Sequence, residues 1–481
     1  MSRKNILSSI GESMTEYNFK TKPFKHQMKA LVQGASRKVY AYFMEMGTGK
    51  TKVAIDNMSF LYEENKINTV IVIAPNSVYR NWVSEIDLHS HVNTTISIHK
   101  LHKNFEMKVD ALNYFLFNVE AFSHDSGVNV LKKIVSDFGK SACVIIDEST
   151  TIKNRQAKRT KNIIKVCLPV TYKRILTGSP ITKSPLDLYS QCDFLESNIL
   201  GFQNYFVFRA RYSVMKQIEV NGNKNVMIPL YYQNLDELED KIRGSSYRVL
   251  KNECLDLLPK IYQKRLIKLS KQQQDIYNDL KLNCRAIIEN EMASYNNKLT
   301  EIIKLQQVCC GFLTTDDGVV KDLPNAKLKE LLNILEETEG KVIIWSSFVK
   351  SIDLIVEKLK EKYGSQSTVE IHGVVSVEAR QSAVINFQEN EKVRFLVGNP
   401  TVGGYGLTLT AASTVIYFNN SFNLEVRQQS EDRAHRSGQN KSVTYIDLIA
   451  EKTLDEFVLK SLNQKMKLSA QTLGEEVLKY L

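Results

Sequence analysis

Short apolar segments that end abruptly in polar or turn residues recur along the chain. In its first half these segments are TVIVIAP (69–75), YFLFNVEAF (114–122), ACVIIDES (142–149) and KRILTGSPI (173–181). Because they are almost continuously apolar rather than alternating, they are typical of strands covered on both faces, as in a parallel sheet. Longer amphipathic segments lie between them: in residues 52–65, Ala54, Met58 and Leu61 recur at helical spacing. Strands that alternate with helices predict a doubly wound α/β fold.

Five further segments of the same kind lie much later in the chain. They are KVIIWSSF (341–348), STVEIHG (367–373), RFLVGNP (394–400), STVIYFNN (413–420) and VTYIDLIA (443–450). The expected strands therefore fall into two clusters, roughly residues 40–180 and 340–450, which predict two parallel-sheet lobes. Between the clusters, Asn221-Gly222 with β-prone flanks predicts a hairpin, and residues 271–313 predict long helices with polar faces.

These patterns predict how the chain is divided. We expect an N-terminal tail (1–20), a first lobe (21–255) with an insertion at about 197–255, a second lobe (256–455) with a helical insertion at about 262–325, and a C-terminal helix (456–481). Thr453 and Glu456 form a capping-box pattern just before an apolar stripe. The last helix is therefore expected to pack back on the lobes as a brace.

The length and the charge of the chain narrow its class. With 481 residues and a mass of 55.0 kDa, the chain is too long for one ordinary core and is expected to form two or more domains. The net charge is +11 and the sequence pI is about 9.0. An excess of lysine and arginine favours a polyanionic partner, most often nucleic acid. The alternative is a basic but unspecific surface.

Cysteine usage and apolar runs exclude other classes. The seven cysteines form no CxxC pair, which indicates neither a disulfide framework nor a zinc site and fits a reducing compartment. No apolar run approaches the roughly 18 residues of a membrane-spanning helix. Residues 1–14 lack the apolar core of a signal peptide. We therefore expect an intracellular protein without a membrane partner.

The segment MEMGTGKTKVAI (44–55) can bind phosphate groups. Gly47 and Gly49 let backbone N–H groups approach phosphate oxygens closely, and the helix expected to begin near Thr51 presents its positive end to the anion. In this pattern Lys50 reaches the β- and γ-phosphates, and Thr51 ligates Mg²⁺. The alternative is an ordinary glycine-rich turn.

Two adjacent carboxylates, Asp147 and Glu148, end the apolar run 142–149. In an ATPase with a phosphate loop, a second strand must bring a carboxylate to the metal. Asp147 at the strand tip can hold Mg²⁺, while Glu148 points elsewhere and can orient and deprotonate the attacking water. The alternative is a strand-end turn with solvated acids.

The segment EVRQQSEDRAHR (425–436) carries arginines that can point at one anion. If the segment is helical, Gln429, Arg433 and Arg436 fall on one face at positions i, i+4 and i+7. An arginine supplied by an opposing lobe stabilises charge on a transferring phosphoryl group and is worth about 10³–10⁵ in rate. The alternative is a solvated arginine-rich helix.

Taken in order, these motifs resemble those of the Swi/Snf-type DNA translocases of helicase superfamily two, over roughly residues 21–465. The matching segments are KPFKHQMKAL, MEMGTGKT, IVIAPNSVYRNWVSEI, IIDEST (motif II), LTGSPI (motif III), WSSF, VGNPTVGGYGLTLTAA and, most specific of all, QQSEDRAHRSGQ (motif VI). Residues 249–277 resemble the family's joint between the lobes. The resemblance implies two RecA-like lobes, ATP in the cleft between them, Mg²⁺, and hydrolysis coupled to steps along duplex DNA.

The resemblance also implies roles for individual residues. The implied catalytic set is Lys50, Asp147, Glu148, Arg433 and Arg436, with Thr51 and Asp147 at the metal. The implied ATP contacts are Gln27 (as adenine reader), Gly47, Thr48, Gly49, Lys50, Thr51, Gly404, Gly406 and Gln429. Thr177 and Ser179 are implied couplers, and the implied DNA contacts are Asn76, Ser77, Ser346, Ser347, Asn399 and Thr401. Contacts to phosphates are sequence-blind and strongly salt-dependent. The alternatives are surface loops without a ligand and, for the glycines, ordinary turns.

The chain departs from the family pattern at a few positions. Ser149 and Thr150 replace the last two residues of the usual D-E-A-H, which leaves open how the fourth position couples to the rest of the site. Met44 stands where the general phosphate loop has glycine, and Ser437 where isoleucine is usual. With no reader segment in the chain, analogy favours a small monomeric motor of a bacterial cytoplasm or a virus-infected host cell.

Four functions compete on these observations. The favoured one is an ATP-driven translocase on double-stranded DNA. A close rival is a strand-separating helicase or branch-migration enzyme acting on forks and junctions, with the Asn221-Gly222 hairpin as a wedge. The others are a DNA-binding scaffold without ATPase activity, which the intact catalytic set argues against, and an RNA helicase.

Overall fold

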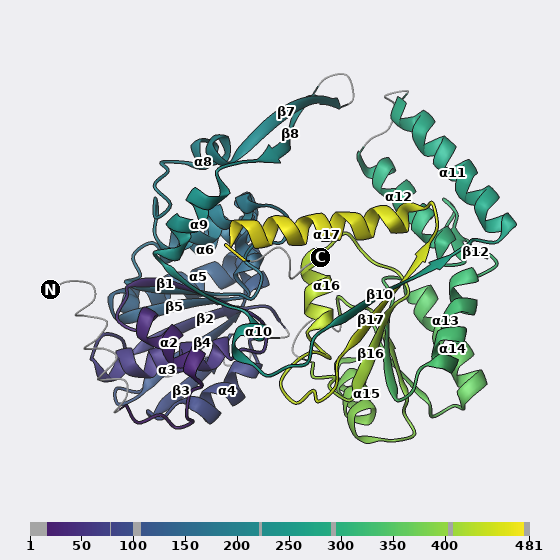
Figure 1. The fold of residues 1–481 in the computed structure, drawn as a ribbon. Helices are drawn as coiled ribbons and strands as arrows, with labels where there is room; N and C mark the ends of the chain where they lie inside the picture. The colour runs from purple at the N-terminus through teal and green to yellow at the C-terminus, as the bar shows by residue number, and fades with distance from the viewer. Residues whose placement is uncertain are drawn as a thin grey trace.

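The computed structural model describes residues 17–76, 78–99, 107–220, 224–289, 295–402 and 407–475. In this part of the chain two parallel sheets, each covered by helices, form two lobes that are bridged by one long helix (Figure 1). The predicted α/β class with two parallel-sheet lobes is confirmed. None of the helices described here combines the length and the apolarity needed to cross a membrane.

The first lobe is built on a seven-stranded parallel sheet with the order β3-β4-β2-β5-β6-β1-β9. Its strands are β1 (Val39–Met44), β2 (Thr69–Ala74), β3 (Thr94–Ile98), β4 (Leu112–Asn118), β5 (Ala142–Asp147), β6 (Tyr172–Leu176) and β9 (Ser246–Val249). β2 and β5 are buried at every position, as their continuous apolar runs predicted.

Helices cover both faces of this sheet. One face carries α2 (Lys25–Gly34), α3 (Lys50–Glu63) and α4 (Asn81–His89); the other carries α5 (Asp125–Phe138), α6 (Lys158–Cys167) and α7 (Leu188–Leu195). The short 3-10 helices are η1 (Val119–Ser123), η2 (Gly139–Ser141), η3 (Ser149–Ile152) and η4 (Pro185–Asp187). Because successive strand residues point to opposite faces, Val70 and Val72 join the first core and Ile71 and Ile73 the second.

An insertion follows the main part of this lobe. It consists of α8 (Tyr205–Tyr212), the antiparallel hairpin β7 (Ser213–Val220) and β8 (Lys224–Tyr232), and α9 (Leu235–Arg243). The predicted turn at Asn221-Gly222 lies outside the described residues. The strand β9 lies within the range assigned to the insertion from the sequence, but it pairs with β1 and belongs to the main sheet. Its mixed residues Ser-Tyr-Arg-Val gave no apolar run that would have marked it.

The second lobe is built on a six-stranded parallel sheet with the order β10-β17-β16-β13-β15-β14. Its strands are β10 (Ile261–Ile267), β13 (Lys341–Trp345), β14 (Thr368–Ile371), β15 (Phe395–Gly398), β16 (Ala412–Tyr417) and β17 (Thr444–Ala450). Its helices are α13 (Ala326–Glu337), α14 (Val349–Tyr363), α15 (Val377–Glu389) and α16 (Leu424–Glu431). The helix α10 (Lys251–Cys254) lies in the joint between the lobes.

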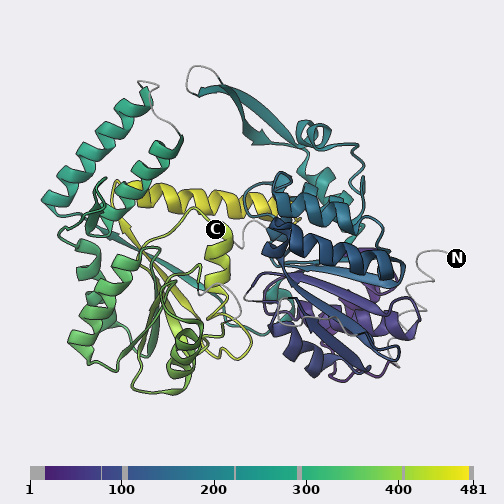
Figure 2. The same cartoon turned by 180° about the vertical axis from the view of Figure 1, so that it is seen from behind.

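The range 262–325, expected to be a helical insertion, begins with a strand. β10 is the edge strand of the second sheet, and most of its side chains are exposed, which is why it gave no buried-strand signal. The rest of the range holds α11 (Lys271–Glu289), α12 (Tyr295–Cys309), β11 (Phe312–Thr314) and β12 (Val320–Asp322). The helices α11 and α12 and the β7–β8 hairpin project from the same side of the molecule (Figures 1 and 2).

The last helix, α17 (Leu454–Thr472), runs from the second lobe to the first (Figures 1 and 2). Near its start, Val458 and Leu462 pack against Leu424 of α16. Just after its end, Leu473 packs against the core of the first lobe. Its cap differs from the predicted box: the Thr453 hydroxyl accepts a hydrogen bond from the N–H two residues on. The helix thus has contacts with both lobes.

Candidate active site

The loop between β1 and α3 has the conformation that anion binding requires. Gly47 and Gly49 adopt φ values of 85° and 86°, in the left-handed region that favours glycine. The helix α3 begins directly afterwards, at Lys50, so its free N–H groups and positive end face the loop. A Cβ added to Gly178 would lie 2.9 Å from the backbone nitrogen of Met46, so the motif III segment packs closely against this loop. The sequence therefore folds here into a preformed cradle for phosphate groups.

Two side chains of α2 support the loop. Nε2 of Gln27 donates a hydrogen bond to the carbonyl oxygen of Thr48 at 3.1 Å, and Nε2 of His26 lies 2.8 Å from the same oxygen. A Cβ at Gly49 would come within 2.2 Å of the Gln27 amide nitrogen. The structure thus brings Gln27 to the loop as expected, although its role as adenine reader stays a prediction. Sequence reasoning missed His26, whose only signal was its position beside Gln27.

The two predicted acids lie together at the end of β5. Asp147 is the last residue of the strand, and Glu148 follows with a left-handed φ of 50°. The indole nitrogen of Trp82 donates to Asp147 Oδ2 at 2.9 Å, and the Thr177 hydroxyl donates to Glu148 Oε2 at 3.3 Å. Trp82 was missed from the sequence. Both acids are buried, and the donors that the described residues supply to them are neutral.

Burial shifts the protonation of this pair. Burial raises the pKa of Glu148 to about 7; the neighbouring Asp147 and Glu425 add to the rise, while Lys50 and Arg433 oppose it. Burial likewise raises the pKa of Asp147, against the opposing charge of Lys50. The Lys50 ammonium group therefore lies close enough to act on both carboxylates. A carboxylate with a pKa near neutrality can take up and release a proton in the physiological range.

The residues present fit a magnesium ion. Mg²⁺ prefers oxygen ligands, and two such groups are the Asp147 carboxylate and the Thr51 hydroxyl at the second position of α3. Asp147 is 4% exposed, and a bound cation would relieve the cost of keeping its charge away from water. Since its hydrogen-bond donors are an indole and a backbone N–H, the carboxylate keeps capacity for a further partner.

The predicted helix over 425–436 is wrong in its second half. α16 ends two residues before Arg433, which lies in a series of turns. The backbone carbonyls that a further helical turn would use have other partners. That of Arg433 accepts from the N–H of Leu409 at 3.0 Å, and that of His435 from Nζ of Lys251 at 2.9 Å. The segment is therefore fixed by contacts from distant parts of the chain rather than by helix periodicity.

The arginines nevertheless lie near the phosphate loop and the acids of the first lobe. Nη1 of Arg433 and Nη1 of Arg436 both donate to the carbonyl oxygen of Leu407, each at 3.3 Å. A Cβ built on Gly47 would lie 3.9 Å from Cβ of Arg436, so Arg436 stands beside the phosphate loop of the other lobe. Arg433 acts electrostatically on Glu148. The acids and the arginines of two separate lobes thus form one site.

A cluster of ion pairs holds the arginine segment to the joint between the lobes. Nζ of Lys251 lies 2.6 Å from Oδ1 of Asp432, and Nζ of Lys260 lies 3.0 Å from Oε2 of Glu431. The backbone N–H of Lys251 donates to Oε2 of Glu45, in the phosphate loop, at 2.7 Å. Sequence reasoning named the joint at 249–277 as a segment but missed these residues, because nothing local pairs them.

The expected coupling residues are placed at matching edges of the two sheets. Thr177 follows β6, and its hydroxyl also accepts from the N–H of Ser179 at 3.2 Å. In the second lobe the amide oxygen of Asn419 accepts from both the hydroxyl of Ser346 and the N–H of Ser347. Asn399 and Thr401 lie in the same cluster: Nδ2 of Asn399 donates to the Ser347 carbonyl, and its Oδ1 accepts from the Thr401 N–H.

Of the remaining expected site residues, the structure describes some and not others. Asn76 follows β2 and is exposed, and Gln429 lies on α16 with 6% of its surface exposed. Ser77, Gly404 and Gly406 lie outside the described residues. The DNA-contact roles of the placed residues stay predictions.

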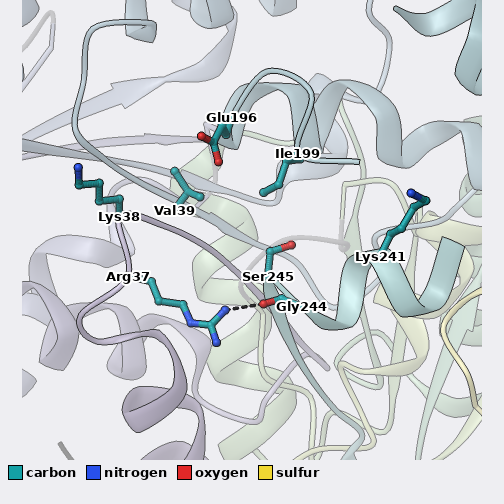
Figure 3. Close-up of a pocket in the computed structure, with 8 residues that line it drawn as sticks. All are labelled: Arg37, Lys38, Val39, Glu196, Ile199, Lys241, Gly244 and Ser245. Atoms are coloured by element: carbon teal, nitrogen blue, oxygen red, sulfur yellow. Dashed lines mark hydrogen bonds between the residues drawn. The ribbon is translucent and has the colours of Figure 1, made fainter. Parts of the chain in front are cut away.

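Two other features of the described residues lie apart from this site. An open pocket of about 470 Å³ is lined by Arg37, Lys38, Val39, Glu196, Ile199, Lys241, Gly244 and Ser245, where Arg37 donates to the Gly244 carbonyl (Figure 3). It lies at the opposite edge of the first sheet, where β1 begins, and contains none of the expected site residues. Asp353, Glu370 and His372 bring possible metal ligand atoms within 4.8 Å of one another in the second lobe. Nδ1 of His372 is buried without a partner among the described residues, whereas metal-bound histidines normally donate their second N–H.

The fold and the site together define a two-lobed α/β protein in which a phosphate loop and two acids of one lobe lie beside two arginines of the other. The model of the SNF2-related domain matches residues 42–312, and that of the helicase conserved C-terminal domain matches residues 325–438. The chain belongs to the SNF2-related family. The identification of a Swi/Snf-type member of superfamily two, made from the motifs, is thereby confirmed.

Several known proteins are similar over most of this chain. An "uncharacterized ATP-dependent helicase MG018" of Mycoplasma genitalium is 30% identical over 446 residues, which cover 90% of this chain and 40% of the relative. ATP-dependent helicase fft2 of Schizosaccharomyces pombe is 24% identical and is covered over 38% of its length. The chain thus spans about two fifths of these relatives. The solved structure of a Sulfolobus solfataricus SWI2/SNF2 ATPase core in complex with dsDNA is similar with a TM-score of 0.44 and 24% identity, over 97% of this chain and 98% of that one.

Proposed function

We propose that the protein is a DNA motor that hydrolyses ATP between its lobes and translocates on double-stranded DNA. The observation that carries the proposal is the position of Arg436 beside Gly47, with Arg433 acting on Glu148. Acids and a lysine come from one lobe and two guanidinium groups from the other. A site divided in this way is complete only when the lobes are together, so closure and hydrolysis are linked. Since one chain supplies both halves, a monomer suffices.

Each residue of the site has a distinct part in this proposal. Lys50 and the N–H groups of the loop bind the β- and γ-phosphates. Asp147 and Thr51 hold Mg²⁺, which supplies neutralisation of phosphate charge. Glu148 accepts a proton from the attacking water, a role that suits a carboxyl group with a pKa of about 7. The Thr177 hydroxyl, hydrogen-bonded to Glu148, keeps that carboxylate oriented.

The arginines complete the site from the second lobe. Arg433 and Arg436 stabilise the charge that develops on the transferring phosphoryl group, as arginines supplied by an opposing domain do. In the structure both donate to one backbone carbonyl, so their guanidinium groups lie close to each other. Preorganised donors of this kind need little rearrangement during the reaction.

DNA contacts are proposed at the carboxyl edges of the two sheets. Asn76 belongs to the first lobe, and Ser346, Ser347, Asn399 and Thr401 form one hydrogen-bonded cluster in the second. Small polar groups and backbone N–H groups suit phosphate oxygens and carry no sequence information. The net charge of +11 agrees with such a partner.

The proposal is tested by the rate of ATP hydrolysis on single-stranded, duplex, forked and four-way DNA and on duplex RNA. A motor on duplex DNA is stimulated by the plain duplex and displaces the third strand of a triplex without unwinding a fork. Lys50→Ala abolishes both activities. A rate that no nucleic acid changes, and that Lys50→Ala leaves unaltered, contradicts the proposal and favours a scaffold. Greater stimulation by duplex RNA favours an RNA helicase.

A second candidate function is strand separation or branch migration. The observation that favours it is the β7–β8 hairpin, which projects from the first lobe beyond the sheet (Figure 1). Projecting hairpins can part the strands of a duplex. Unwinding of a plain fork that is lost when residues 216–229 are replaced by a short turn would support this function. Triplex displacement that survives the same replacement would leave translocation as the activity.

A further inference from the structure

Glu425 of the second lobe reaches into the motif II loop of the first. Its Oε1 accepts a hydrogen bond from the Thr150 hydroxyl at 2.8 Å, and its Oε2 lies 2.9 Å from Nζ of Lys153. The Glu425 side chain is 13% exposed and that of Lys153 is 29% exposed. Both carboxylate oxygens are therefore engaged by the opposite lobe in a largely buried contact. Thr150 is also one of the two positions at which the chain departs from the usual motif II.

The two partners of Glu425 belong to a loop that is fixed to the first lobe. Nζ of Lys153 also donates to the Thr182 hydroxyl at 2.6 Å, and the backbone carbonyl of Lys153 accepts from the Ser190 hydroxyl at 2.7 Å. The Ser149 hydroxyl donates to the side chain of Gln191 at 2.7 Å. Because these contacts hold η3 against α7, a force applied at Thr150 acts on the whole loop that begins with the proposed base.

On the other side, Glu425 is rigidly connected to the arginine segment. It lies in the first turn of α16, whose N-cap, Asn423, accepts from the Glu425 N–H at 3.0 Å. The helix has eight residues, about 12 Å of rise, and Arg433 lies two residues beyond its end. A helix of this length with both ends held moves as one unit. Any rotation that separates Glu425 from Thr150 therefore also moves the arginines relative to the phosphate loop.

We propose that Glu425 is a positioning residue that sets the second lobe in register against the motif II loop, so that the arginines face the phosphate loop when the lobes close. The inference rests on the proposed function. The Thr150–Glu425–Lys153 bridge exists only while the lobes are together, and it ties the loop of Glu148 to the helix that leads to Arg433. This bridge also couples the fourth position of motif II to the rest of the site, because the Thr150 hydroxyl donates to the Glu425 carboxylate of the opposite lobe.

Electrostatics agrees with this placement. The charge of Glu425 is among those that raise the pKa of Glu148, so the bridge lies within electrostatic range of the proposed base. Hydrogen bonds to charged groups are individually stronger than neutral ones. Since each tenfold change in rate corresponds to about 1.4 kcal/mol, loss of one or two such bonds from the closed state is expected to lower turnover about 10- to 100-fold.

The test uses Glu425→Ala, the near-isosteric Thr150→Val, and the double variant, assayed for ATP turnover at saturating duplex DNA. We expect the turnover number to fall about 10- to 100-fold in Glu425→Ala, with the KM for ATP, the affinity for a fluorescent ATP analogue and the affinity for DNA unchanged. A merely structural role would lower stability or alter these affinities instead. Glu378→Ala is the matched control, since Glu378 is an exposed acid in the first turn of α15, also in the second lobe; it should behave as the wild type.

The double variant identifies the bridge itself. If Thr150 acts through Glu425, the double variant should be no slower than Glu425→Ala alone. Wild-type turnover in Glu425→Ala, or strictly multiplicative effects of the two changes, would overturn the inference while leaving the motor intact. If the wild type shows no DNA-stimulated turnover and Lys50→Ala equals it, the proposed function and this inference fail together. Thermal unfolding of each variant confirms that Thr150→Val, which keeps its volume, is folded.

Discussion

Two pairs of adjacent buried acids lie in opposite lobes, and they are held in opposite ways. Asp147 ends β5 of the first lobe and Glu148 follows it, whereas Glu431 ends α16 of the second lobe and Asp432 follows it. All four are at most 8% exposed. The donors to the first pair are neutral. The second pair is surrounded by cations, with Lys260 at 3.0 Å and Arg427 at 2.7 Å from Glu431.

The pKa values of the two pairs diverge accordingly. Burial raises the pKa of Asp147 and of Glu148 above their ordinary values. Burial also acts on Glu431, but Lys260 and Arg427 outweigh it, and the pKa of Glu431 lies below its ordinary value. Asp432 follows the same pattern, with Lys251 as the main opposing charge. Burial alone therefore does not decide the state of an acid; its permanent partners do.

Under the proposed function, this difference separates a reactive pair from a structural one. The first pair accepts hydrogen bonds only from neutral donors among the described residues, and it keeps acceptor capacity for a ligand that comes and goes. The carboxylates of the second pair form ion pairs with lysines and an arginine. This pair anchors the turns that carry Arg433 and Arg436. Perturbed acids in clefts are candidates for catalysis, and here the structural pair serves as an internal reference.

The largest effect is expected from the segment that the structural pair holds. Arg436→Ala removes a guanidinium group from the phosphate loop while leaving Glu431 and Asp432 in place. We expect ATP turnover to fall by about 10³–10⁵ with little loss of DNA affinity, measured by steady-state hydrolysis and by fluorescence anisotropy with duplex DNA. Normal turnover in this variant would show that the arginine has no part in the reaction.

A slightly smaller effect is expected at the reactive pair. Glu148→Gln keeps the size and hydrogen-bonding shape of the side chain but removes the base, so turnover should fall by about 10²–10⁴. Binding of a fluorescent ATP analogue should be retained, because Lys50 and the loop are unchanged. Glu120→Gln, at an exposed acid of the same lobe, serves as the control. Retained turnover in Glu148→Gln would require another base.

The structural pair should respond in stability instead. Glu431→Gln leaves Lys260 and Arg427 without their buried partner, and breaking such a pair costs about 3–5 kcal/mol in the free energy of unfolding. The pKa of Glu431 is lowered in the folded state, so this stabilisation is present above the unfolded pKa of about 4.5 and is lost as the pH falls through the folded value. Denaturant titrations at several pH values measure it.

An exposed ion pair gives the matched comparison for that measurement. Glu337 pairs with Arg265 on the surface of the same lobe and is 61% exposed. Glu337→Gln should change the free energy of unfolding by no more than about 1 kcal/mol. Equal effects of Glu337→Gln and Glu431→Gln would show that the buried cluster is not structural.

The smallest effect has the opposite sign. Because the pKa of Glu148 is raised to about 7 from its ordinary 4.5, the folded state prefers the protonated form. Its contribution to stability is present below pH 4.5 and is lost as the pH rises through about 7. Without nucleotide or Mg²⁺, Glu148→Gln should therefore be about 1–2 kcal/mol more stable than the wild type at pH 8 and nearly equal to it at pH 5. A loss of stability at pH 8 would contradict the comparison.

The strands that sequence patterns predicted well are those buried on both faces. β2, β5, β13 and β16 consist mostly of apolar residues, and their burial follows from that composition. β9 and β10 lie at the edges of their sheets and carry polar or exposed side chains. Only pairing with a distant strand makes them strands, so local composition could not reveal them.

The site residues show the same difference: those in local motifs could be predicted from the sequence, and those fixed by contacts with distant parts of the chain could not. Lys50, Asp147 and Glu148 lie in short motifs whose backbone conformation follows from glycines and strand ends. The helical face proposed for Arg433 was wrong, because Leu409 and Lys251, far away in the chain, fix the local backbone. Trp82 was missed for the same reason, since its partner Asp147 is 65 residues away.

The bridging helix α17 gives the molecule a second connection between its halves, in addition to the joint near α10. Two lobes that are connected at two separate places can rotate easily only about the axis that passes through both connections. The helix α17, with 19 residues and a length of about 28 Å, fixes one of these connections and limits how far the lobes rotate. The two connections would then determine the direction of each rotation, and ATP hydrolysis between the lobes would determine only when the rotation occurs.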